Sequence, residues 1–220
     1  MLARQVLRER LDALQESTND LGTLVEYAVD QAAQTLASGD SAVTARLGET
    51  NKRIRTRSVA LNEQCLLLIA TQQPVASDLR LIMATMAIAT DLERIGDHAR
   101  GVTRLTRRMW RDTPSAHLPS ALQAMAQQVQ VFLHGALDAF RERDVEGARR
   151  LLGDDSAIDT AYTILAKELL MSMVAQPETL TRGMNLLKVA HKLERIGDRT
   201  SNIGERTIWM RTGAPPGRGE

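Results

Sequence analysis

The sequence Leu-Glu-Arg-Ile-Gly-Asp stands at positions 92–97 of this chain and again at positions 193–198. A repeated hexapeptide is expected by chance in roughly one of several thousand chains of this length, so it indicates a tandem duplication. A chain of 220 residues is long enough for two halves of about 100 residues each. The repeat therefore predicts two copies of one structural unit.

Apolar residues outside the hexapeptide indicate helices along the whole chain. Aromatic residues make up only 3% of the sequence, so the core must come from Leu, Ile, Val, Met and Ala, many of which favour helices. These residues recur three and four positions apart, as they do on one face of an amphipathic helix. They predict six helices, at about residues 4–37, 41–71, 77–111, 120–141, 145–175 and 178–210.

Short polar and proline-containing segments separate the predicted helices. Because short connections make neighbouring helices antiparallel, each half should be a three-helix bundle. The predicted fold class is thus all-α, with two tandem three-helix bundles related by internal duplication. We assign the first bundle to residues 1–112 and the second to residues 113–212. We expect a disordered tail at residues 213–220, which are rich in glycine and proline.

The composition excludes several classes of protein. The net charge is +1, from 28 basic and 27 acidic residues, so we expect no direct binding of nucleic acid. The single cysteine, Cys65, lies in an apolar run and excludes an intrachain disulfide; we expect a buried, inert thiol in a reducing compartment. The sequence shows neither a signal peptide nor an apolar stretch long enough to span a bilayer. We therefore expect a cytoplasmic protein.

Both copies of the hexapeptide contain two carboxylates four residues apart, Glu93 with Asp97 and Glu194 with Asp198. Residues at this spacing lie on one face of a helix, where two like charges destabilise the helix unless a cation binds them. In the second half, Asn202 continues the same stripe one turn further along. The stripe predicts a cation site on the last helix.

The helix predicted at residues 145–175 adds a second pair of carboxylates, Asp155 and Asp159. If this helix is the antiparallel neighbour of the last one, the two pairs could face each other across a groove. Such an all-oxygen site suits Mg²⁺, Mn²⁺, Ca²⁺ or ferric iron, and carboxylates can also bind Zn²⁺. The alternative interpretation is a solvated acidic surface with ordinary helix caps.

The first half offers fewer oxygen ligands than the second. Basic side chains occupy much of the matching segment at residues 50–55, and Gly101 stands where the second half has Asn202. Arg94 and Arg195 follow the two glutamates; they could bind an anion such as phosphate beside a metal, or be ordinary surface arginines. We expect metal binding to be weaker in the first bundle.

The sequence predicts no catalytic residue. We interpret His98, His134 and His191 as packed or capping side chains rather than metal ligands. The sequence contains no Glu-x-x-His motif, and no Ser–His–Asp or Cys–His grouping suggests an activated nucleophile. We expect that the protein is not an enzyme. A metal-dependent enzyme acting on phosphorylated substrates and a plain helical scaffold are the alternatives.

Three stretches resemble the PhoU family, the accessory regulators of the phosphate-specific transport system. They are Gln-Pro-Val-Ala-Ser-Asp-Leu-Arg at 73–80, Asp-Leu-Glu-Arg-Ile-Gly-Asp at 91–97 and Glu-Arg-Ile-Gly-Asp-Arg-Thr-Ser-Asn-Ile at 194–203. The resemblance covers nearly the whole chain. It implies two pseudo-symmetric three-helix bundles in which Glu(Asp)-x-x-x-Asp motifs hold metal clusters.

The resemblance also implies a set of metal ligands. They are Glu93 and Asp97 in the first bundle, and Asp155, Asp159, Glu194 and Asp198 in the second, with Asn202 as an addition. The implied ions are divalent or trivalent: iron, zinc, manganese or magnesium. Asn51 and Arg55 depart from the family pattern, which tends to place oxygen ligands there. Arg55 in particular argues against a metal site in the first bundle.

The function that the resemblance implies is negative regulation of phosphate uptake and phosphate-starvation signalling, and hence phosphate homeostasis. A protein of this family would act as an adaptor between the ATPase subunit of a phosphate ABC transporter and a sensor histidine kinase. It would approach the membrane only through these partners. We further expect a homodimer.

Overall fold

The computed structural model describes residues 2–39, 42–112, 118–153 and 156–213. Within these ranges the chain forms seven α-helices, one short 3-10 helix and no strand, which confirms the all-α class. The helices are α1 (Leu2–Ser38), α2 (Ala42–Gln72), α3 (Ala76–Asp112), α4 (Ser120–Glu142), α5 (Val145–Gly153), α6 (Ser156–Ala175), η1 (Pro177–Thr179) and α7 (Leu180–Thr212).

The single helix expected at residues 145–175 is wrong, because α5 ends at Gly153 and α6 begins at Ser156. Glycine is a poor helix former. A side chain at Gly153 would meet no neighbour within 4 Å, so packing does not require a glycine there. The low helix propensity of Gly153 therefore favours the end of helix α5 at this residue.

The last helix begins and ends with residues suited to helix termini. Pro177 opens the 3-10 turn η1, so α7 starts at Leu180 rather than at the expected residue 178. Gly213 closes α7 in the left-handed conformation, with φ of 75° and a backbone N–H donated to the carbonyl of Trp209 at 2.8 Å. Residues 214–220 of the expected disordered tail lie outside the described residues.

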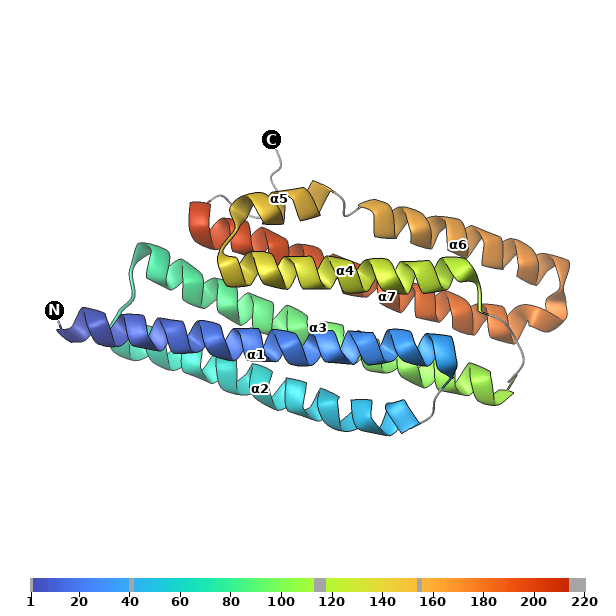
Figure 1. Ribbon diagram of the computed structural model, residues 1–220, viewed down its shortest axis with the longest axis horizontal. Helices are drawn as coiled ribbons and strands as arrows, with labels where there is room; N and C mark the ends of the chain where they lie inside the picture. Colours follow the sequence, from blue (N-terminus) through green and yellow to red (C-terminus); the bar gives the residue numbers. More distant parts are fainter. Residues whose placement is uncertain (1, 40–41, 113–117, 154–155, 214–220) are drawn as a thin grey trace.

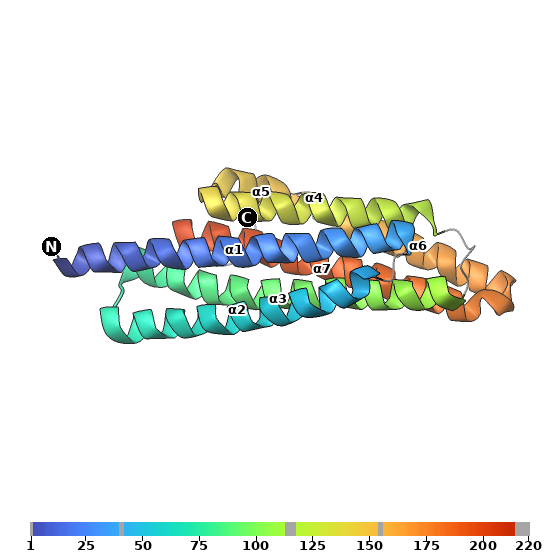
Figure 2. The same cartoon turned by 60° about the horizontal axis from the view of Figure 1, so that its bottom comes forward.

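The helices form two three-helix bundles that lie along each other (Figure 1). The first bundle is α1, α2 and α3; in the second, α5 and α6 together take the place of one long helix between α4 and α7. The bundles meet mainly through α3 and α7, with α1 also contacting α4. Figure 2 shows the same arrangement from another side. The two tandem bundles confirm the predicted duplication.

Helices α3 and α7 pack antiparallel around a pseudo-twofold axis. The Asn202 amide donates a hydrogen bond to Oδ1 of Asp91 at 3.2 Å. Ten residues further along α3, a Cβ added to Gly101 would lie 2.6 Å from Cε of Lys192, so these two residues also face each other. The repeat that relates the hexapeptides exchanges Asp91 with Lys192 and Gly101 with Asn202. The pseudo-symmetry of the sequence is therefore also that of the helix pairing.

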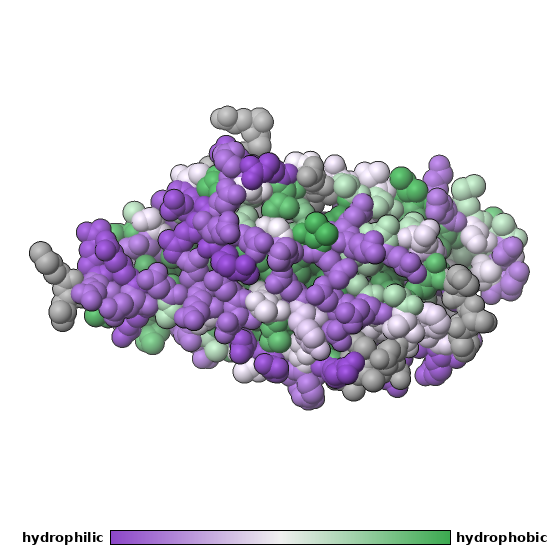
Figure 3. All heavy atoms as spheres, in the orientation of Figure 1, coloured by the Kyte–Doolittle hydropathy of each residue, from purple (hydrophilic) through white to green (hydrophobic). Residues whose placement is uncertain are grey.

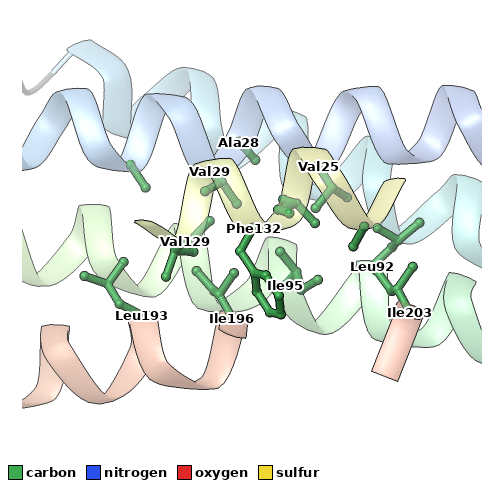
Figure 4. Close-up of a cluster of buried hydrophobic side chains, with 14 of the residues drawn as sticks. Val25, Ala28, Val29, Leu92, Ile95, Val129, Phe132, Leu193, Ile196 and Ile203 are labelled. Carbon is green, nitrogen blue, oxygen red and sulfur yellow. The ribbon is translucent and has the colours of Figure 1, made fainter. Parts of the chain in front are cut away.

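Both bundles share one hydrophobic core. Buried side chains of α1, α3, α4 and α7 interdigitate at the centre of the molecule (Figure 4). The labelled members are Val25, Ala28, Val29, Leu92, Ile95, Val129, Phe132, Leu193, Ile196 and Ile203. Since each bundle buries apolar side chains of the other, the two repeats form one cooperative unit.

Cys65 lies in α2 and is fully buried, as the sequence predicts. Burial raises the pKa of its thiol to about 12, because the thiolate would lose its hydration. The reactive form of a cysteine is the thiolate. Cys65 is therefore an inert core residue.

The face of the molecule shown in Figure 3 is largely hydrophilic, with apolar side chains gathered over α6 and the adjoining part of α7. The exposed apolar residues of these helices are Ile164, Leu170, Met171, Val174, Leu180 and Met184. Across the described ranges, no helix combines the length and the apolarity needed to traverse a bilayer.

Candidate metal centre

Three carboxylates converge between α6 and α7 in the second bundle. Asp159 comes from α6, while Glu194 and Asp198 lie one turn apart on α7. One carboxylate oxygen of each residue lies within 4.8 Å of those of the other two. Among the described residues, this is the one group of three or more acidic, histidine or cysteine side chains placed closely enough to share a metal ion.

The glycine of the repeated hexapeptide allows the two helices to approach. A Cβ added to Gly197 would lie 3.1 Å from Cδ1 of Ile158, which is tighter than ordinary contact. Asp198 follows Gly197, and Asp159 follows Ile158. The close approach of the first pair therefore brings the carboxylates of the second pair together.

The electrostatics of Glu194 fit a cation at this position. Its Oε2 atom is buried and accepts no hydrogen bond from the described residues, although Nδ1 of His191 lies 3.1 Å away. Burial, followed by the negative charge of Asp198, raises the pKa of Glu194 above its ordinary value. A metal ion would satisfy this buried oxygen and offset the repulsion between the carboxylates.

One cationic side chain already neutralises part of the cluster. Nη1 of Arg195 forms an ion pair with Oδ2 of Asp198, and both side chains are about one-third exposed. Three carboxylates thus face a single permanent positive charge, with His191 beside them. Arg195 is therefore engaged with the acidic cluster itself.

In the first bundle, an arginine lies between the corresponding carboxylates. Nε of Arg55 lies 3.3 Å from Oε1 of Glu93, and its Nη2 lies 3.3 Å from Oδ2 of Asp97. The amide nitrogen of Asn51 donates a hydrogen bond to Oδ1 of Asp97 at 2.8 Å. Both carboxylates are thus paired by groups that cannot be displaced without breaking ion pairs. Glu93 and Asp97 are thus engaged in ion pairs within the chain, and both stay predictions as metal ligands.

The two sites have the same register. A Cβ added to Gly96 would lie 2.9 Å from Cδ1 of Ile54, as one added to Gly197 would approach Ile158. Arg55 follows Ile54, just as Asp159 follows Ile158. One site therefore has an arginine where the other has an aspartate.

The remaining candidate ligands lie elsewhere or outside the described residues. Asn202 is engaged at the junction of α3 and α7 through its hydrogen bond to Asp91. Asp155 lies outside the described residues. Both stay predictions as metal ligands.

Asp91 is a residue whose role the sequence analysis missed. It is only 7% exposed and accepts hydrogen bonds from Asn202 and from Nη1 of Arg199, each at 3.2 Å. Its position two residues before Glu93 places it on another face of α3. Only the packing of α3 on α7 shows what that face contacts, so no local pattern could have found it.

Two histidines lie outside the acidic cluster. His134 of α4 contacts Oε1 of Glu26 in α1 through Nδ1 at 2.8 Å, and Oδ2 of Asp138 through Nε2 at 3.2 Å. His98 is half-buried, and burial together with the positive charge of Lys192 lowers its pKa to about 4. The position of His98 agrees with a packed histidine, whereas the side chain of His134 is 67% exposed and forms surface contacts.

The chain is similar in sequence to several proteins of known name. The family model described as "PhoU domain" matches twice, at residues 18–106 and 122–207. A Pseudomonas aeruginosa protein, "Phosphate-specific transport system accessory protein PhoU homolog", is 33% identical over 190 residues, 86% of this chain and 78% of that protein. Escherichia coli strain K12 has a "Phosphate-specific transport system accessory protein PhoU" that is 32% identical over 195 residues, 89% of this chain and 80% of that protein.

Solved structures share the architecture as well. The crystal structure of PhoU from Pseudomonas aeruginosa has a TM-score of 0.91 at 31% identity, covering 94% of this chain and 99% of that chain. The phosphate transport system regulatory protein PhoU from Streptococcus pneumoniae has a TM-score of 0.88 at 29% identity, with 94% and 98% covered. The similarity thus extends over both bundles and their packing.

Proposed function

The chain belongs to the PhoU family, and we propose that it is an accessory protein of phosphate-specific transport that holds metal in its second bundle only. The relatives described above are named accessory proteins of that transport system. We place this chain with them as a regulator that acts by binding rather than as an enzyme. It would restrain phosphate uptake and phosphate-starvation signalling when phosphate is abundant.

The contrast between Arg55 and Asp159 supports metal binding in one bundle. In the first bundle the guanidinium of Arg55 supplies the positive charge between Glu93 and Asp97. In the second bundle Asp159 adds a third carboxylate, and a buried oxygen of Glu194 is left without a hydrogen bond. Among the described residues, the second site therefore has no arginine that bridges its carboxylates as Arg55 does, because Arg195 pairs with Asp198 alone.

A metal ion there would be held by Asp159, Glu194 and Asp198. Oxygen donors suit magnesium, manganese, iron or zinc, and the nearby Nδ1 of His191 is compatible with the last three. The metal would cross-link α6 to α7 and so fix the exposed side of the second bundle. Its contribution is structural, because no activated nucleophile lies beside the three carboxylates among the described residues.

The proposed partners are the ATPase subunit of a phosphate ABC transporter and a sensor histidine kinase. Both would be met in the cytoplasm, and the protein would reach the membrane through them. We also propose that it works as a homodimer and does not bind nucleic acid directly. The near balance of acidic and basic residues supports the last point.

Metal analysis of matched variants tests the site. Protein purified without chelator should contain metal, and Glu194→Gln with Asp198→Asn should remove it. The matched control, Glu93→Gln with Asp97→Asn, changes the same pair of residue types in the first bundle and should retain it. Equal metal content in all three proteins would overturn the proposed site.

A reporter of phosphate-starvation genes tests the function. In cells that lack their own copy of the gene, the wild-type chain should restore repression in phosphate-rich medium, and the second-bundle variant should not. A metal-free variant that still represses would identify the protein as a plain helical scaffold. Turnover of phosphoesters that depends on the bound metal would instead favour an enzyme.

A further inference from the structure

A basic groove lies between the C-terminal part of α3 and the N-terminal part of α7. Its volume is about 780 Å³. Six of its lining side chains carry a permanent positive charge. The lining residues are Arg104, Leu105, Arg107, Arg108, Arg111, Lys188, His191 and Lys192, none of which is acidic.

Helical spacing produces this concentration of charge. The four arginines of α3 stand at i, i+3, i+4 and i+7, so they share one face of the helix. On α7, Lys188, His191 and Lys192 stand at i, i+3 and i+4 and share the facing side. Like charges four residues apart destabilise a helix. The net charge of the chain is only +1, so an excess of basic residues in the whole sequence does not explain this concentration of positive charge.

Most of these cations have no acidic partner. Arg108 and Arg111 form ion pairs with the exposed Asp112, at 3.8 and 3.2 Å. Within the described ranges, Arg104, Arg107, Lys188 and Lys192 form neither an ion pair nor a side-chain hydrogen bond. Their donors are therefore available to a ligand.

We propose that this groove binds a chain of consecutive phosphoryl groups, such as an inorganic oligophosphate or the phosphate tail of a nucleotide. A single phosphate carries about two negative charges and would leave most of the cations uncompensated. Several linked phosphates match both the number of positive charges and their spread along two helices. Arginine is well suited to such a ligand, because its fork of donors fits phosphate oxygens bidentately.

The size and lining of the groove argue for a small anion. Its volume falls within the range of about 300 to 1,000 Å³ that is typical of small-molecule sites. Leu105 is the one apolar residue in the lining, which includes no Phe, Tyr or Trp on which a base could stack. Binding should therefore depend on the phosphates rather than on an attached nucleoside.

The shape of the groove also depends on the packing of the two bundles. The Lys192 side chain extends over Gly101 of α3, where a Cβ would lie 2.8 Å from its Nζ. The absence of a side chain at Gly101 therefore creates the space for Lys192. Because the groove takes residues from both halves of the chain, neither repeat contains the site alone.

This inference goes beyond the proposed function, because it requires neither a bound metal nor a transporter. The groove and the three carboxylates are separate, although His191 lines the groove and lies 3.1 Å from Glu194. Tripolyphosphate is itself a chelator of metals. Binding must therefore be measured both in the wild-type protein and in the variant with Glu194→Gln and Asp198→Asn.

Isothermal titration with sodium tripolyphosphate at low salt tests the proposal. The double substitution Arg104→Gln with Lys188→Gln should weaken binding about tenfold or more, since charge-assisted contacts are lost. Both residues are exposed, so the fold should be kept. The matched control is Arg53→Gln with Lys167→Gln, which removes the same charges from exposed positions of α2 and α6 and should bind as the wild type does.

The remaining arms of the experiment identify the ligand. ATP that binds as tightly as tripolyphosphate, and orthophosphate that binds far more weakly, would support recognition of the phosphate chain itself. If both double variants lost the same binding affinity, the loss would come from the change in net charge alone, and the proposal would be overturned. The proposal would also be overturned if the groove bound an acidic peptide but not tripolyphosphate. The same holds if it bound orthophosphate as tightly as tripolyphosphate.

Discussion

Arg55 of α2 lies at the position that Asp159 occupies in α6, because each follows the isoleucine that packs against the glycine of the repeated hexapeptide. This difference changes the charge at corresponding positions of the two sites. In the first bundle a guanidinium bridges Glu93 and Asp97. In the second bundle a carboxylate joins two others.

Replacing Arg55 should therefore create a second metal site. Arg55→Asp leaves three carboxylates in the first bundle, in the arrangement seen in the second. We expect the metal content per protein to increase, as measured by elemental analysis. Arg53→Asp, which adds the same charge at a nearby exposed position, serves as control. An unchanged metal content in the Arg55 variant would show that Arg55 is not what prevents metal binding in the first bundle.

Removing the charge of Glu194 should stabilise the metal-free protein. Its pKa is raised in the folded state, so the ionised carboxylate opposes folding above its ordinary pKa of about 4.3. Glu194→Gln should raise the stability of chelator-treated protein at neutral pH by about 0.5 kcal/mol. Thermal unfolding with and without added metal measures this. Metal should stabilise the wild type but not the variant. Metal that stabilises the variant but not the wild type would exclude Glu194 as a ligand.

The contact between α1 and α4 should depend on pH through His134. The hydrogen bond to Glu26, with the charge of Asp138, raises the pKa of His134. The protonated imidazole therefore stabilises the folded protein fully below the ordinary pKa of about 6.5. This stabilisation is lost as the pH rises through the elevated pKa. The difference in Tm between the wild type and His134→Asn should shrink as the pH rises from below about 6.5 through the elevated pKa. A difference that stays constant over this range would contradict this role.

Gly39 should tolerate no side chain. It follows α1 with φ of 69°, and an added Cβ would lie 2.5 Å from Cδ2 of Trp110. Gly39→Ala should destabilise the fold by about 2 kcal/mol in urea unfolding, from backbone strain and the clash together. Gly48→Ala is the control, because Gly48 lies within α2 with open space around it, and alanine there should stabilise by up to about 1 kcal/mol.

The parts of the structure that the sequence predicted are those that depend on local pattern. The spacing of apolar residues located α1 to α4 to within a few residues, and the duplicated hexapeptide indicated the paired bundles. The i,i+4 spacing also suggested that Asp159 could face Glu194 and Asp198 if their helices were antiparallel neighbours, and the structure brings the three carboxylates together. Arg55 was recognised as a departure, although its ion pairs were not.

The parts that were missed depend on how one helix packs on another. Gly153 is a single residue in an otherwise helical pattern, so periodicity gave no reason to end α5 there. The contact of Asp91 with Asn202 depends on the angle between the two bundles. The basic groove had a partial signal, since Arg104, Arg107, Arg108 and Arg111 share a helix face, but its other wall comes from residues more than 70 positions away.

The shared core has an evolutionary consequence. Once two copies of a unit bury their apolar faces in each other, neither can be lost, yet each is free to specialise as long as the joint interior is maintained. In one copy an arginine of the chain lies between the two carboxylates, whereas in the other copy a third carboxylate joins them. The two copies thus differ in charge at corresponding positions while they share a single interior.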